Sequence, residues 1–314
     1  MDANAVLQLL QQLVSSPNPQ SEKLLKDLEQ SPQYIPCLLS VAASPHAPED
    51  VRLMACISVK NSLSTLLYRD TDQDLTGVQE MLLKSIAVQQ TPEKVLTQLS
   101  IVVAMVAKRT WPSGWPSLFS VLLRMMQSSE DGLRRGLFFT DEVLKEIGSK
   151  LNLRMQKAKI TKFRTGVAPL LSPVLTVWQQ QTMALLNSFN ALSKDAALKK
   201  DKIGEEKEQG IVSLCRLVLT ASNCVRHLVV HGVVDASDSK DAQSFFSFVL
   251  QVVVFLVPFR NNTVMSLSSL TGATRLAIHN CVGKIAICLA RIATECQESD
   301  PLGFRSFLAP FLSG

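Results

Sequence analysis

The chain has 314 residues, of which 46% are hydrophobic and only 6% aromatic, with a net charge of +5. That composition favours helices packed through Leu, Val and Ala over a β-sandwich. The basic excess is mild and spread along the chain, so it does not require a nucleic-acid partner.

The first residues, the most apolar run and the cysteines all bear on the cellular compartment of the protein. The first residues, Met1 to Asn4, lack the basic region of a secretory signal. The most apolar run, 245–257, is too short to span a bilayer, so we interpret it as a buried helix and expect no membrane insertion. Seven cysteines occur without a Cys-x-x-Cys pair, which favours reduced thiols in the cytosol or nucleus.

Pro-marked turns divide the first half of the chain into helices. Asn18 is placed to cap a helix that has Pro19 at its first position, and Thr91 with Pro92 is placed to begin another. The predicted helices are 3–14, 19–30, 31–43, 49–68, 73–89, one from 92, 117–127 and 131–149.

The second half continues the pattern with longer helices. A helix over 153–190 is expected to bend near Gly166, Pro169 or Pro173. Residues 194–208 mix Lys with Asp and Glu and are interpreted as a solvated loop. Further helices are predicted at 209–234, 242–257 and 272–297, with a last one from about Pro301.

Helices therefore alternate with short turns, and the pattern predicts no strands. Second helices of successive pairs begin near 18, 49, 92 and 131. A spacing of roughly 40 residues suits HEAT-type repeats, so the predicted fold is an all-α solenoid. No polar capping repeat is evident near residue 314, so we expect the chain to be the N-terminal portion of a longer protein.

The stretch 49–68 has apolar residues on every side of its helical wheel, which indicates neighbours on several sides. Arg52, Lys60 and Asn61 lie among these apolar residues. Polar groups in such a setting need partners, either within the fold or on a bound protein.

These residues carry a family resemblance. Val51-Arg52, Ala55 and Val59-Lys60-Asn61-Ser62-Leu63 resemble the N-terminal signature of the importin-beta family, an Arg-x-x-Ala followed by Lys-Asn-x-Leu. Upstream and downstream segments support it: 9–13, 21–28, 95–107, and then Pro112, Trp115, Pro116 and Leu118. Within the family the importin-eleven branch is the most similar. The resemblance covers about residues 1–130, and 131–314 continue only the helical alternation.

The resemblance implies a function and partners. Members are nuclear transport receptors whose first repeats bind the GTP-bound form of the GTPase Ran on a concave face. They also take Phe-Gly nucleoporins and protein cargo, and they move between nucleus and cytoplasm through the nuclear pore. By this resemblance 1–130 would be the Ran-binding region, with further HEAT-like repeats in 131–314. No enzyme activity, metal, cofactor or nucleic acid is expected. The alternative is a generic HEAT-repeat scaffold that binds another protein but no GTPase.

Arg52, Lys60 and Asn61 are the Ran-binding candidates, and each has a competing structural role. Arg52 is placed to pair with an acid of the adjacent repeat, and Asn61 to bond buried backbone at a helix junction. We favour the structural role for Asn61 and leave both roles open for Lys60 and Arg52, since a long cation can pack its stem while its charge reaches solvent.

Four other patterns are given packing or surface roles. Trp111 and Trp115 bracket the Pro112–Pro116 turn and are interpreted as a hydrophobic plug between repeats, rather than a peptide pocket. Arg134-Arg135 and the cations of 154–164 are interpreted as a solvated face. Cys224, His227 and His231 share a helix, but the outer pair are about 10 Å apart along its axis, too far for one tetrahedral zinc. Cys281, Cys288 and Cys296 form a core stripe.

Overall fold

The computed structural model describes residues 2–69, 74–89, 91–154, 157–197, 203–230, 240–267 and 269–299. Within these ranges every regular element is helical. The α-helices are α1 (Ala3–Ser15), α2 (Pro19–Leu28), α3 (Tyr34–Ala43), α4 (Glu49–Arg69), α5 (Thr76–Ala87), α6 (Glu93–Thr110), α7 (Leu118–Met126), α8 (Glu130–Arg154), α9 (Lys157–Ala197), α10 (Glu205–Val230), α11 (Lys240–Pro258) and α12 (Gly272–Ser299). A π-helical turn (Phe259–Thr263) and a 3₁₀ turn (Val264–Ser266) follow α11.

Local chemistry explains where several of these helices begin. Asn18 accepts a hydrogen bond from the Ser21 N–H at 2.8 Å, and Pro19 occupies the first turn of α2, as predicted. Glu49 and Asp50 lie in the first turn of α4, where carboxylates stabilise the positive end of the helix dipole. Thr91 departs from the prediction, because its hydroxyl donates to the Val88 carbonyl instead of capping α6.

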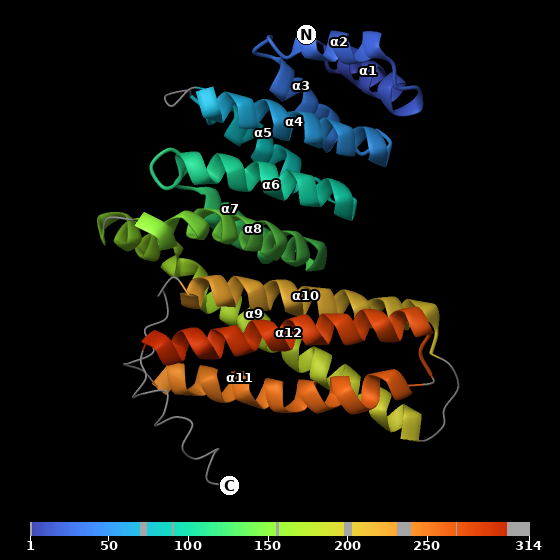
Figure 1. Ribbon diagram of the computed structural model, residues 1–314, viewed down its shortest axis with the longest axis vertical. Helices are drawn as coiled ribbons and strands as arrows, with labels where there is room; N and C mark the ends of the chain where they lie inside the picture. The colour runs from blue at the N-terminus through green and yellow to red at the C-terminus, as the bar shows by residue number, and fades with distance from the viewer. Residues whose placement is uncertain are drawn as a thin grey trace. The chain divides into compact units, whose positions relative to one another are not determined.

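The chain forms two compact units, Met1–Met155 and Gln156–Gly314. In the first unit α4, α6 and α8 lie side by side and pack against a second layer that contains α3, α5 and α7 (Figure 1). Each second-layer helix precedes its partner in the chain, so the layers are built from consecutive helical pairs. The helices α2, α4, α6 and α8 begin at 19, 49, 93 and 130, within one residue of the predicted starts.

In the second unit α10 packs against α9 and α12, and α12 also contacts α11 (Figure 1). Trp178 of α9 is fully buried, and its indole N–H donates to the Ser222 hydroxyl of α10 at 3.0 Å. Phe245 and Phe248 of α11 pack against the same indole in tilted and edge-on geometries, at 5.6 and 5.1 Å between ring centroids. The contacts of Trp178 therefore join α9 to both α10 and α11.

Two predictions for this half need correction or lie outside the described residues. The solvated loop over 194–208 is wrong at both ends, because α9 continues to Ala197 and α10 begins at Glu205. Glu208 is buried and accepts hydrogen bonds from Thr271 and Thr274, more than 60 residues away. The last predicted helix, from Pro301, lies outside the described residues.

Two segments, Ser247–Ser266 and Gly272–Thr294, are long and apolar enough to cross a bilayer by length and composition alone. Core helices of soluble proteins meet the same criterion, so this is weak evidence for a membrane span. The run 245–257 was considered too short, but continuous helical turns extend the apolar segment to Ser266.

Candidate functional site

The exposed sides of α4, α6 and α8 form one surface in the first unit. Each of these helices has a second-layer helix behind it and neighbours beside it, so a single stripe of each remains accessible. We call this surface the α4–α6–α8 face. Its accessible side chains are Ile57, Lys60, Asn61, Ser64 and Tyr68 of α4, Gln98, Ile101, Met105, Lys108 and Arg109 of α6, and Phe138, Asp141, Glu142, Lys145 and Glu146 of α8.

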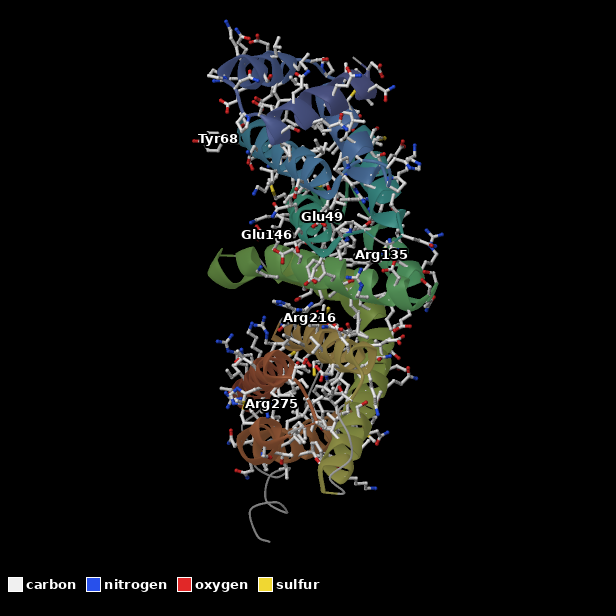
Figure 2. The ribbon with its side chains drawn as sticks, turned by 90° about the vertical axis from the view of Figure 1, so that its right-hand side faces the viewer. Glu49, Tyr68, Arg135, Glu146, Arg216 and Arg275 are labelled. Carbon is white, nitrogen blue, oxygen red and sulfur yellow. The ribbon has the colours of Figure 1, made fainter. Side chains whose placement is uncertain are left out.

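Polar contacts join neighbouring helices across this face. Lys60 of α4 donates to the side-chain carbonyl of Gln98 on α6, at 3.4 Å between Nζ and Oε1. Lys108 of α6 forms an ion pair with Glu146 of α8. Both contacts join residues 38 positions apart, so the same spacing relates successive helix pairs. Figure 2 shows Glu146 and Tyr68 on this side of the unit.

Lys60 is the best candidate for contact with an acidic partner. It is half-exposed, and its recorded hydrogen bond goes to a neutral amide. In the part of the chain that the structure describes, no carboxylate lies within ion-pair distance of its ammonium group, whereas Lys108 and Lys145 are paired with Glu146 and Glu142. A carboxylate from a bound protein would therefore be a stronger acceptor than the present one.

Arg52 is not on this face. Only 5% of it is exposed, and its Nε donates to the Ala42 carbonyl at the end of α3, at 2.9 Å. Burial lowers the pKa of Arg52, with opposing effects from Cys56 and Glu49. The prediction that Arg52 pairs with an acid of the adjacent repeat is wrong, because its partner is the Ala42 backbone carbonyl of the preceding helix. The guanidinium joins α3 to α4 at the C-terminal end of α3, where a cation is favourable.

Asn61 is exposed, so the predicted buried bonds to backbone are also wrong. Its own carbonyl accepts a hydrogen bond from the Thr65 hydroxyl at 3.2 Å, a contact within the helix. The wheel of α4 is apolar all round, and only the packed neighbours decide which stripe meets solvent. Asn61 therefore stays a candidate for partner contact, on the same accessible stripe as Tyr68.

The turn after α6 packs inward through its second tryptophan. Trp115 is 3% exposed, while Pro116 is exposed and Pro112 is half-buried. Trp111 makes an edge contact with Phe119 of α7, at 5.3 Å and 77°. These positions agree with a hydrophobic plug between helices.

The adjacent arginines of α8 differ, and sequence reasoning missed one of them. The side chain of Arg134 is 43% exposed, as a solvated face requires. Arg135 is buried, and its guanidinium donates to Asp131 at 2.7 Å and to the Ile86 and Val88 carbonyls at 2.5 and 2.9 Å. The one available signal was the i, i+4 spacing of Asp131 and Arg135. Figure 2 shows Arg135 away from the α4–α6–α8 face.

The structure does not assemble a metal site from the described residues, where no group of three or more potential ligands is found. Cys224 and His227 are buried, and Arg226 lies 3.2 Å from the His227 ring nitrogen. His231 lies outside the described residues. Cys281 and Cys288 are buried, as a core stripe requires, and the side chain of Cys296 is not described.

Two family models match this chain. The importin-beta N-terminal domain matches residues 21–69, which include α4 and its signature. The exportin 1-like protein family matches residues 92–221. The two matched segments together extend from α2 into α10 and so cover parts of both units.

Curated relatives are similar over most of the chain at low identity. Importin-11 of Homo sapiens is 22% identical over 263 residues, covering 80% of this chain and 25% of the relative. The importin beta-like protein kap113 of Schizosaccharomyces pombe is 24% identical over 260 residues, covering 79% and 25%. The chain thus spans about a quarter of the length of the curated relatives it matches.

A solved structure supports the architecture. The exportin Cse1 in its cargo-free, cytoplasmic state aligns with all of this chain and 44% of its own length, with a TM-score of 0.53 and 14% identity. This likeness confirms the predicted fold class, an all-α solenoid of HEAT-type repeats. At that identity it bears on the fold alone.

Proposed function

The chain belongs to the importin-beta superfamily, of which it represents the N-terminal part, and from this we propose that it binds the small GTPase Ran in its GTP form as part of a nuclear transport receptor. The observation that carries the proposal is the position of the family signature. It lies on α4, inside the segment matched by the importin-beta N-terminal domain, and it contributes Lys60 and Asn61 to an accessible face.

The proposed Ran-binding site is the α4–α6–α8 face. Lys60 exchanges its neutral Gln98 partner for a carboxylate of the GTPase, and Asn61 and Tyr68 supply contacts beside it. Arg52 contributes indirectly, since it orders α3 against α4 from within the core. The assignment of Ran binding to residues 1–130 and of further repeats to 131–314 stays part of this proposal.

The complete receptor would do more than this chain. We propose that it carries protein cargo through the nuclear pore, contacts Phe-Gly nucleoporins on the way, and moves between nucleus and cytoplasm. Ran-GTP and cargo are coupled by linkage, so each ligand weakens the binding of the other when their sites overlap or need different curvature. Such a receptor acts by binding and has no catalytic role.

The test is a binding titration of the chain against Ran loaded with a non-hydrolysable GTP analogue and, separately, with GDP. We expect preferential binding of the GTP form, weakening as salt is raised, because part of the contact is electrostatic. Lys60→Ala should raise the Kd roughly fivefold, equivalent to about 1 kcal/mol, with unchanged circular dichroism.

Lys23→Ala is the matched control, since Lys23 is an exposed lysine of α2 outside the α4–α6–α8 face. It should leave the Kd unchanged. Equal affinity for the two nucleotide states, or no binding at high protein concentration, would contradict the proposal and favour a HEAT-repeat scaffold without GTPase binding. A Lys23→Ala effect as large as that of Lys60→Ala would move the contact off the proposed face.

A further inference from the structure

The helices α10 and α12 run parallel in a fixed register. At their beginnings the Thr274 hydroxyl donates to Glu208, and just beyond their middle the Cys288 thiol donates to the Ser222 carbonyl at 3.3 Å. Within each of these pairs the two residues are 66 positions apart in the sequence. A constant offset over this length means that residues 66 apart face each other all along the contact.

Cys215 and Cys281 share this offset and lie midway between the two pairs, seven residues from each. Their thiols lie close enough across the helix interface for each to shift the pKa of the other. Packed helices lie about 8–10 Å apart, which brings facing Cα atoms to roughly 3.5–5.5 Å when the backbone radius is about 2.3 Å. That separation overlaps the range of Cα distances in disulfides, about 4.4–6.8 Å.

The two thiols have different surroundings. Cys215 is fully buried, whereas Cys281 is 9% exposed at the edge of the interface. Arg216 and Lys284 are exposed cations whose charges act on Cys281, and Arg216 is labelled on α10 in Figure 2. The hydrogen bond from Cys215 lowers the pKa of Cys281 against the effect of burial, and these two cations lower it further. The same hydrogen bond and burial raise the pKa of Cys215.

We propose that Cys215 and Cys281 are an oxidative modification site, at which a peroxide converts the two thiols into a reversible disulfide between α10 and α12. The thiolate of Cys281 attacks one peroxide oxygen and becomes a sulfenic acid, while the other oxygen leaves as hydroxide and is protonated to water. The Cys215 sulfur then attacks the sulfenic sulfur, the S–S bond forms, and a second water leaves. The two thiols lose two electrons and the peroxide gains them.

The modification rests on the register of α10 and α12, and it is independent of any Ran-binding role. In a reducing compartment such a bond would be transient, which is the usual character of intracellular disulfides. It would close a loop of more than sixty residues and hold α10 against α12. Cys288 serves as an internal comparison, since its thiol already donates to Ser222 and Asn223.

The experiment treats the reduced, purified chain with increasing hydrogen peroxide, traps remaining thiols with N-ethylmaleimide and identifies peptides by mass spectrometry. We expect a peptide pair that joins Cys215 to Cys281, lighter by two hydrogens and released by dithiothreitol. The melting temperature of the oxidised chain should rise by about 4 °C or more. Recovery of both cysteines as maleimide adducts while methionines are oxidised would overturn the proposal.

Three variants test the order of events. In Cys215→Ser the sulfenic acid of Cys281 should persist and be trapped by dimedone, whereas in Cys281→Ser Cys215 should remain a thiol. Cys288→Ser keeps a donor to the Ser222 carbonyl and should form the link as the parent chain does. A link that involves any other cysteine, or one that forms equally in Cys281→Ser, would refute the assignment.

Discussion

Replacing Arg135 with Met tests how the first unit is held together. The methionine keeps the apolar stem but removes a guanidinium that donates to the Ile86 carbonyl, the Val88 carbonyl and Asp131. Hydrogen bonds from a charged donor contribute about 1.5–3 kcal/mol each, and the variant loses one to the buried Ile86 carbonyl and one to the partly buried Val88 carbonyl, which keeps its bond from Thr91. Asp131 is partly exposed and can be rehydrated. We therefore expect a loss of about 3–5 kcal/mol in the free energy of unfolding.

The neighbouring Arg134 is a matched control on the same helix. It pairs with the same Asp131 at 3.1 Å, but its side chain is 43% exposed. Arg134→Met should cost only about 0–1 kcal/mol, as exposed ion pairs do. Equilibrium urea unfolding, followed by circular dichroism, measures both changes. Equal costs for the two variants would refute the argument that burial, and not the ion pair with Asp131, sets the contribution of Arg135.

Four further substitutions follow from the described contacts. Gly136→Ala should destabilise the chain by about 1–3 kcal/mol, because an added Cβ would lie 2.6 Å from Met126 Cγ. An added Cβ at Gly210 meets open space, so Gly210→Ala should stabilise α10 by about 0.5–1 kcal/mol. Thermal unfolding measures both changes. Glu208→Gln should be less stable at neutral pH. Burial alone would raise the pKa of Glu208, but hydrogen bonds from Thr274 and Thr271 outweigh it and lower the pKa, so the carboxylate stabilises the fold above the usual glutamate range. That advantage over Glu208→Gln should shrink as the pH falls through the lowered folded-state pKa, and a pH-independent difference in urea midpoint would contradict it. Asn61→Ala should leave the melting temperature within about 1 °C, since Asn61 is exposed; a larger drop would mean that its side chain has buried partners.

Sequence alone predicted the helices and their pairing because the signals are local. Pro19 with the Asn18 cap marks the start of one helix, and the uninterrupted run from Glu49 marks another. The recurrence of these starts predicted stacked helical pairs, and the signature on α4 identified the family. Such features depend on the conformational preferences of a few residues that are neighbours in the sequence, so they can be predicted without knowing the tertiary structure.

The tertiary structure decided which polar residues are buried, because burial depends on neighbours that are distant in the sequence. Arg134 and Arg135 are adjacent and identical, yet only Arg135 reaches the end of α5. Glu208 belongs to a charged run typical of a loop, but Thr271 and Thr274 lie beside it in the fold. The sequence favours a buried role for Asn61 and offers an acid as one partner for Arg52, whereas in the fold Asn61 is exposed and Arg52 is buried against a backbone carbonyl. A helix that is apolar all round does not specify its own exposed stripe, so only the packing of α3, α6 and α1 around α4 determines which residues meet solvent.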